Sequence, residues 1–193
     1  MGVEETAKKN RIYKIQKGDE HTFECLFKEY YLHLTRFAWR YVKSKAIAEE
    51  LVQEVFANIW ENRSTWSPAG PIKAYLYQAV KHRALDHLKH EEVRQEYDPK
   101  WMDNKEHPTI DFEDQFRRKQ LRKAIKKEIE ALPSRSKMTY KLHRYDGLTY
   151  KEIAQVMDVS VKTVESQMTR TLKRLRERLA YLLPFILVAT LTM

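Results

Sequence analysis

The side chains best suited to recognising another molecule follow Ser160, in the run VKTVESQMTRTLKRL at residues 161–175. If this run is helical, its polar and basic side chains gather on one side at about 100° per residue. They are Lys162, Thr163, Ser166, Arg170 and Lys173, with Gln167 and Arg174 on the flank. Such groups bind phosphates and the edges of base pairs in the DNA major groove. The alternative is an ordinary solvated face of an amphipathic helix.

The elements that must hold this face are two short helices joined by a tight turn. Thr149 and Glu152 have the spacing of a capping box, which begins the first helix. The run Asp158–Ser160 ends it, and Ser160 is suited to cap the second helix. The second helix carries an apolar stripe that we expect to be buried, formed by Val161, Val164, Met168, Leu172, Leu175 and Leu179. This pattern predicts a helix-turn-helix whose second helix enters a major groove.

The positive charge of the chain is concentrated around the same helix pair. Of the 36 Lys and Arg and 27 Asp and Glu in the chain, residues 114–179 carry 18 basic and 8 acidic side chains. Residues 1–113 carry 18 basic and 19 acidic side chains, so the formal net charge of +9 arises from the C-terminal part. A localised positive excess indicates a polyanionic partner.

A second candidate nucleic-acid surface lies on a helix that we expect to begin at Pro71. Basic side chains are interleaved with aromatic ones over residues 71–90. Basic groups hold phosphates and aromatic rings stack on unpaired bases, so this combination suits the capture of a melted DNA strand. The residues that we expect on this surface include Lys73, Tyr77, Lys81 and His82.

The histidines of this helix also raise the question of a metal site. His82, His87 and His90 have no cysteine or cluster of carboxylates among them, and their spacing fits no common zinc pattern. We therefore predict no metal and no other cofactor.

Residues 46–60 form a further amphipathic segment. Its apolar side is formed by Leu51, Val55, Phe56 and Ile59. Its opposite, polar side is formed by Glu50, Gln53, Glu54 and Asn58. Taken alone, this polar side favours a solvated helix face, because such faces need no partner.

The whole chain is predicted to be all-α, with two small helical domains joined by a flexible acidic linker. It has only 4 Gly and 6 Pro in 193 residues, and no run predicts a strand. Residues 11–90 form the first expected domain, and residues 115–179 form the second, which holds the helix-turn-helix. Between them, residues 91–114 carry 9 acidic and 3 basic side chains and two prolines, a composition typical of a linker.

Motifs for catalysis and for secretion are both missing from the sequence. It has no glycine-rich phosphate loop, no nucleophile motif and no paired acids in an apolar setting, so we predict that the protein is not an enzyme. The single cysteine, Cys25, fits a reducing cytosol. The N-terminal residues lack the apolar core of a signal peptide, and we expect a cytoplasmic protein.

Three stretches in this order resemble a bacterial RNA polymerase sigma factor of the extracytoplasmic-function group. AIAEELVQEVFANIW (46–60) resembles the family's polymerase-binding helix, and IKAYLYQAVKHRALDHL (72–88) resembles its promoter-opening helix. Residues 132–179 resemble its reader of the upstream promoter element. The resemblance covers most of residues 20–179. In two departures, Tyr75 stands where the family usually has Trp, and His82 stands where it usually has Asn.

The resemblance implies a transcription initiation factor that binds core RNA polymerase, directs it to specific promoters and helps to melt the promoter DNA. Residues 11–90 would be sigma region 2, and residues 115–179 would be sigma region 4. The polar side of residues 46–60 would grip a coiled coil on the largest polymerase subunit. The loop at 62–70 would hold a flipped base with Trp66 as a wall; the alternative is that Trp66 is pinned onto the core.

A helix-turn-helix regulator that binds duplex DNA without polymerase is the second candidate function, and an enzyme is a distant third. Such regulators gain affinity from a second half-site, usually by dimerisation. The sequence shows one reader and no evident dimerisation helix, which favours dependence on polymerase.

The last residues, AYLLPFILVATLTM at 180–193, are uncharged and mostly apolar. They are too few for an ordinary membrane span of about 20 residues, and Pro184 interrupts them. Three roles stay open for this tail: a plug on the protein's own surface, a docking segment for a partner such as an anti-sigma factor, or an anchor on a membrane surface.

Overall fold

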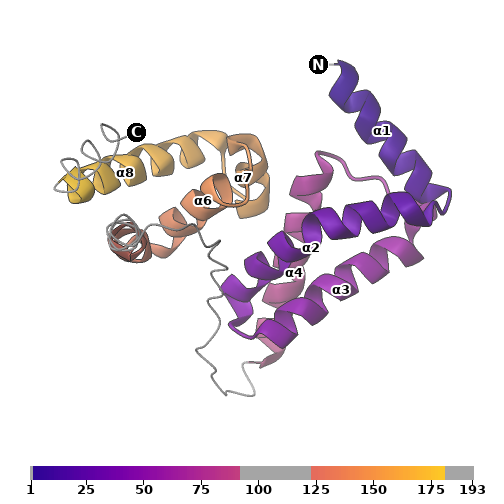
Figure 1. Ribbon diagram of the computed structural model, residues 1–193, viewed down its shortest axis with the longest axis horizontal. Coiled ribbons are helices and arrows are strands. Elements are labelled where there is room, and N and C mark those ends of the chain that lie inside the picture. Colours follow the sequence, from indigo (N-terminus) through magenta and orange to yellow (C-terminus); the bar gives the residue numbers. More distant parts are fainter. Residues whose placement is uncertain (1, 92–122, 181–193) are drawn as a thin grey trace, which may run out of the picture. The chain divides into compact units, whose positions relative to one another are not determined.

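The computed structural model of the chain describes residues 2–91 and 123–180 (Figure 1). All regular elements in these ranges are helical, and the all-α prediction is confirmed. The chain divides into two compact units, Met1–Asp103 and Asn104–Met193. Most of the expected linker at 91–114 and the tail after Ala180 lie outside the described residues. Among the described helices, none has the length and apolarity needed to cross a membrane.

Three long helices build the first unit: α2 (Glu20–Val42), α3 (Lys45–Glu61) and α4 (Ile72–Glu91). Figure 1 shows them packed side by side, in indigo to magenta. The Asp19 carboxylate accepts a hydrogen bond of 2.7 Å from the Thr22 N–H and so caps α2. Lys43 ends α2 in the left-handed conformation with φ 57°, and Ser44 caps α3. Lys43 and Ser44 therefore separate α2 from α3.

The core of the first unit is both aliphatic and aromatic. The apolar residues expected to face it from residues 46–60 are all buried. Phe37 of α2 and Tyr77 of α4 have ring centroids 4.9 Å apart in the centre of this core. Burial of large rings of this kind contributes much of the stability of a small helical domain.

An N-terminal helix, α1 (Gly2–Gln16), adds to this unit and was not predicted. Its last turn buries Ile15 completely and places Gln16 Nε2 2.9 Å from the carbonyl oxygen of Trp66, to which it donates a hydrogen bond. Trp66 follows η1 (Arg63–Thr65), a short 3-10 turn inside the predicted loop. The end of α1 therefore fixes the loop that leads into α4.

The second unit contains a helical segment at 123–130, then α6 (Ser134–Arg144), α7 (Tyr150–Met157) and α8 (Val161–Leu179). The capping box at α7 is present: Glu152 Oε2 accepts from the Thr149 N–H at 2.8 Å, and Thr149 Oγ1 accepts from the Glu152 N–H at 3.3 Å. Asp158 ends α7 with φ 56°, and Ser160 caps α8. The predicted helix-turn-helix is confirmed.

The buried side of α8 differs from the prediction at Leu172, and the predicted end residues Val161 and Leu179 are only partly buried. The residues that it buries are Val164, Met168, Thr171 and Leu175. Leu172, which was expected in this stripe, is 46% exposed. Neighbouring residues of a helix are turned by about 100°, so Thr171 and Leu172 cannot both face the core. Both residues lie three or four positions from Met168 and from Leu175, so the spacing alone does not separate them, and only the packing of α8 shows that Thr171 is the buried one.

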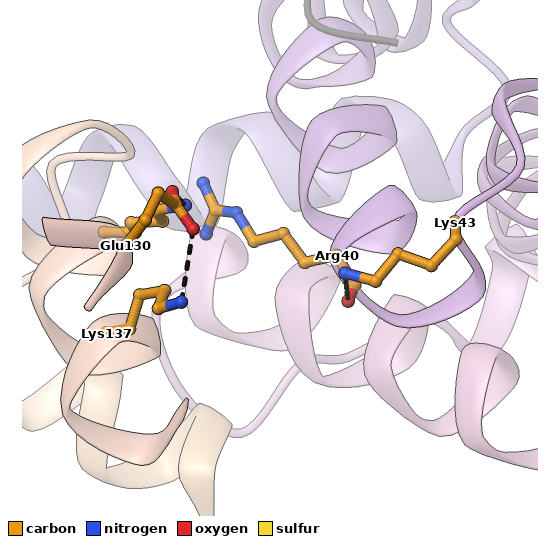
Figure 2. A network of polar contacts seen from close by, with 5 residues as sticks. Arg40, Lys43, Glu130 and Lys137 are labelled. Atoms are coloured by element: carbon orange, nitrogen blue, oxygen red, sulfur yellow. Dashed lines mark hydrogen bonds and ion pairs between the residues drawn. The ribbon is translucent and has the colours of Figure 1, made fainter. Parts of the chain in front are cut away.

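Ion pairs hold the 123–130 segment against the rest of the second unit. The Glu130 carboxylate lies 2.6 Å from the Lys141 ammonium and 3.2 Å from that of Lys137, and Figure 2 shows the second of these pairs. Arg178 of α8 pairs with Glu128 at 3.0 Å. Partial burial alone would raise the pKa of Glu130, but the hydrogen bonds from Lys141 and Lys137 outweigh it and lower that pKa.

Figure 2 also shows how Lys43 closes α2 within the first unit. Its ammonium donates a hydrogen bond of 2.8 Å to the carbonyl oxygen of Arg40. Carbonyl groups in the last turn of a helix have no partner inside the helix, and a lysine there also complements the helix dipole. The left-handed residue that ends α2 thus also satisfies one of its terminal carbonyl groups.

Candidate nucleic-acid and polymerase interfaces

The outward side of α8 forms a shallow hollow of about 280 Å³. The residues that line it are Ser160, Lys162, Thr163, Ser166, Gln167 and Arg170. The hollow therefore brings together most of the residues predicted from the sequence. No carboxylate lines it, so its charge comes from Lys162 and Arg170, and its remaining groups are hydroxyls and one amide.

The side chains of the hollow differ in how firmly they are held. Lys162 and Arg170 are exposed, and neither has an ion-pair partner among the described residues. The Thr163 and Ser160 hydroxyl oxygens lie 2.8 Å apart. Gln167 Oε1 lies 2.7 Å from the hydroxyl of Thr139 in α6. The hollow thus combines two free cations with hydroxyl and amide groups that the fold has already positioned.

Lys173 and Arg174, which were also predicted on this face, do not line the hollow. Lys173 lies three residues beyond Arg170 in α8, with its ammonium 4.0 Å from the Glu177 carboxylate and both side chains largely exposed. Arg174 is half-buried. Such exposed pairs contribute little to stability, so Lys173 can exchange Glu177 for an external anion at small cost.

Two of the residues predicted to contact a melted strand lie in the core, Trp66 in the loop before α4 and Tyr77 on α4. Tyr77 is fully buried, and Trp66 is only 6% exposed. The Trp66 ring packs edge-on against Tyr75 with centroids 6.0 Å apart, as in the alternative in which it is pinned onto the core. Both rings pack in the core, where their burial removes apolar area from water. Neither ring therefore has a free face on which a base could stack.

The other three residues predicted on this surface remain accessible. Lys73 and Lys81 are partly exposed at the border of the buried side of α4, and His82 is fully on the surface. Lysines in such border positions bury their alkyl stems and leave their ammonium groups in solvent. The accessible part of the predicted surface therefore consists of cations and one imidazole ring.

A larger groove of about 510 Å³ runs between α3 and α4. Its lining includes Glu54 and Asn58 from the predicted polymerase-binding side, and His82 from the predicted strand-binding side. Across it, Arg83 Nε donates a hydrogen bond of 2.7 Å to Glu54 Oε2. The two sides come from different helices, and a contact between residues 29 positions apart has no local sequence signal.

Glu50 and Gln53, the remaining residues of the predicted polymerase-binding side, are exposed. Neither lines the groove, and neither has an ion-pair partner among the described residues. They lie on the side of α3 opposite its buried apolar residues. Within the described ranges, no group of three or more His, Cys, Asp or Glu residues is arranged to hold a metal ion.

Comparison with protein families matches both units. Residues 26–93 match the model described as sigma-70 region 2, and residues 122–175 match the model described as sigma-70, region 4. Together the two ranges take in more than half of the chain.

Two bacterial relatives match along most of their length. The ECF RNA polymerase sigma-E factor of Escherichia coli K12 is 28% identical over 171 residues, which cover 82% of this chain and 87% of that protein. The RNA polymerase sigma-H factor of Pseudomonas aeruginosa is 24% identical over 182 residues, which cover 89% of this chain and 93% of that protein.

Two solved structures share the fold. CnrH, solved in complex with the cytosolic domain of CnrY, aligns with a TM-score of 0.57 at 19% identity, covering 89% of this chain and 96% of CnrH. The sigma factor RpoE, solved with the anti-sigma factor NepR from Bartonella quintana, aligns with a TM-score of 0.54 at 20% identity, covering 82% of this chain and 96% of RpoE.

Proposed function

We infer that this chain, which belongs to the sigma-70 family and within it to the extracytoplasmic-function group, is a promoter-specific initiation factor of bacterial RNA polymerase. It binds core RNA polymerase, directs it to specific promoters and helps to melt the promoter DNA. It is not an enzyme, because the polymerase supplies the chemistry. The observation that carries this function is the order of the two units, region 2 followed by region 4, each with its own helical fold.

In region 4, we propose that α8 lies in the major groove of the upstream promoter element. The hollow on its outward side supports this, because it offers cations, hydroxyls and an amide without a carboxylate. Lys162, Ser166 and Arg170 would face base edges there, with Thr163 and Gln167 beside them. Lys173 and Arg174, which lie outside the hollow, would contact phosphates.

In region 2, the strand-capturing surface that we propose is smaller than the one expected from the sequence. It consists of Lys73, Lys81 and His82, since Trp66 and Tyr77 belong to the core. The lysines would hold phosphates of the melted strand, and the exposed imidazole of His82 would stack on an unpaired base. In this proposal His82 alone stacks on an unpaired base, a role that the sequence had also suggested for Trp66 and Tyr77.

The polymerase-binding side of region 2 is proposed to be the outer side of α3. Glu50 and Gln53 are fully available there, and Asn58 is exposed at the edge of the groove. Glu54 completes this side, but its carboxylate is already engaged by Arg83. A contact with the coiled coil of the largest polymerase subunit would therefore rely mainly on Glu50 and Gln53.

We further propose that an anti-sigma factor regulates this chain. RpoE, which shares this fold, was solved with the anti-sigma factor NepR, and CnrH was solved with the cytosolic domain of CnrY. The apolar tail at 180–193 is a candidate docking segment for such a partner or for a membrane surface. Because bacterial RNA polymerase works in the cytoplasm, we place the protein there.

Polymerase dependence of DNA binding separates this function from that of a regulator that acts alone. Fragments of the host genome would be incubated with the chain, with core polymerase, or with both, and the retained fragments sequenced. Specific fragments are expected only when both proteins are present. Equal enrichment by the chain alone would identify it as a stand-alone helix-turn-helix regulator instead.

A further inference from the structure

The side chain of Gln167 is held by a residue outside the helix-turn-helix. Thr139 of α6 is 1% exposed, and its hydroxyl oxygen lies 2.7 Å from Gln167 Oε1. The same hydroxyl lies 3.0 Å from the carbonyl oxygen of Arg135, one turn earlier in α6, so its single proton is directed at the nearer acceptor, Gln167 Oε1. Because Gln167 lines the hollow of α8, a buried hydroxyl fixes a side chain that faces the proposed DNA partner.

This contact separates the Gln167 amide into two halves with different tasks. Oε1 accepts the hydrogen bond of a buried hydroxyl and is therefore directed toward the protein. Nε2 carries two N–H groups and is left for an external partner. An amide accepts only through its oxygen and donates only through its nitrogen. Toward DNA, Gln167 is therefore a hydrogen-bond donor.

A donor at this position reads base pairs differently from a free glutamine. Free glutamine recognises adenine by two bonds, in which Oε1 accepts from N6 and Nε2 donates to N7. With Oε1 committed to Thr139, one donated bond remains. Guanine, adenine and thymine each present an acceptor in the major groove, whereas cytosine presents the N4 donor. Cytosine opposite Nε2 would place a donor against a donor.

We propose that Thr139 is a positioning residue that determines promoter specificity without touching DNA. By holding Oε1 of Gln167, it makes Gln167 reject cytosine at one position of the upstream element and withholds the two-bond contact with adenine. This inference rests on the proposed function, because it requires α8 to read duplex DNA.

The experiment uses the full chain with core polymerase and a promoter library randomised across the upstream element. Bound promoters are sequenced, and the relative occupancy of the four bases is obtained at each position. Gln167→Ala identifies the position that Gln167 reads, where base preference should flatten. Thr139→Val then removes the hydroxyl while keeping the shape of the side chain.

Thr139→Val should change the preference at that same position alone. The discrimination against cytosine should fall roughly three- to tenfold, and adenine should gain relative to guanine, because the freed amide can turn its oxygen outward. Thr139→Ser keeps the hydroxyl and should restore the parent preference. Thr171→Val is the matched control: it makes the same change at a buried threonine whose hydroxyl has no hydrogen-bond partner among the described residues, and it should leave the preference unaltered.

The outcomes separate a failure of this inference from a failure of the proposed function. If Thr139→Val weakens all promoters equally, or if Thr139→Ser behaves like Thr139→Val, the positioning role is refuted while promoter reading stands. If Gln167→Ala flattens no position, Gln167 does not read bases and the inference fails. If the parent chain with core polymerase shows no upstream preference at all, the proposed function fails with it.

Discussion

Thr139 and Thr171, two buried threonines of the second unit, make opposite contributions to its stability. Both are almost completely buried. The Thr139 hydroxyl lies within hydrogen-bond distance of Gln167 Oε1 and of the carbonyl oxygen of Arg135 in its own helix. The Thr171 hydroxyl oxygen has no hydrogen-bond partner within the described part of the chain. A buried hydroxyl with partners is neutral or stabilising, whereas one without a partner carries an uncompensated desolvation cost.

Replacing Thr171 with valine should therefore stabilise region 4. The change keeps the branched shape and removes the unsatisfied hydroxyl, so we expect a gain of about 1 kcal/mol in the free energy of unfolding. Thermal unfolding followed by circular dichroism would show it as a higher midpoint for Thr171→Val and a lower one for Thr139→Val. A lower midpoint for Thr171→Val would mean that this hydroxyl has a partner, and the reasoning would be wrong.

At the scale of secondary-structure elements, α3 and α4 serve different partners but share one groove. Arg83 and Glu54 connect them across it at 2.7 Å. A substitution of Glu54 therefore disturbs both helices at once. Tests of either proposed surface should use residues that lie outside this pair.

For polymerase binding, the suitable change is Glu50→Lys together with Gln53→Ala. Both residues are exposed, so helix content should stay constant while binding to core polymerase weakens. Co-purification with core polymerase measures the effect. Glu20→Lys, an equal change of charge at the exposed start of α2, is the control. If the double variant binds core polymerase as well as the parent does, the outer side of α3 is not the contact.

For promoter opening, the suitable change is Lys81→Ala together with His82→Ala. Unstacking a base costs a few kcal/mol, which the capturing surface must recover. We expect near-normal polymerase binding, reduced permanganate reactivity of unpaired thymines, and recovery of transcription on a template with a premelted bubble. Lys89→Ala with His90→Ala removes the same residue types further along α4 and should change little. Without recovery on the bubble template, α4 would not be the strand-capturing helix.

The packing of the segment at 123–130 against α6 should weaken in acid because of Glu130. Its pKa is lowered in the folded protein, so its contribution to stability is present above the unfolded carboxyl pKa near 4.5 and is lost as the pH falls through the lowered value. Glu130→Gln should therefore lower the unfolding midpoint at neutral pH, and the difference should shrink in acid. Glu165→Gln, at an exposed position of α8, is the control. If the difference in unfolding midpoint between the parent and Glu130→Gln did not depend on pH, the Glu130 carboxylate would not be the cause.

At the scale of the whole molecule, the sequence predicted the elements that carry strong periodicity or caps. The capping box at Thr149 and the cap at Ser160 are local signals, and both are present in the structure. The helix α1 was missed because it has few apolar residues and its anchors, Ile15 and Gln16, pack against distant parts of the chain.

The predictions of site residues were less complete, for a related physical reason. An aromatic residue in a basic helix suits both a core and a stacking surface, and only packing decided that Tyr77 and Trp66 are buried. Leu172 and Thr171 are adjacent, so a small error in the predicted direction of the apolar stripe of α8 placed Leu172 in the core in place of Thr171. The contact of Thr139 with Gln167 spans 28 positions and leaves no pattern in the sequence.

Transcription from genomic DNA tests the central claim most directly. Purified core polymerase of the host bacterium would be supplied with genomic templates, with and without the full chain, and the 5′ ends of the transcripts mapped. We expect discrete start sites that appear only when the chain is present and that share an upstream element, and Arg170→Ala should reduce transcription from them. Identical start sites with and without the chain would show that it does not direct the polymerase to promoters.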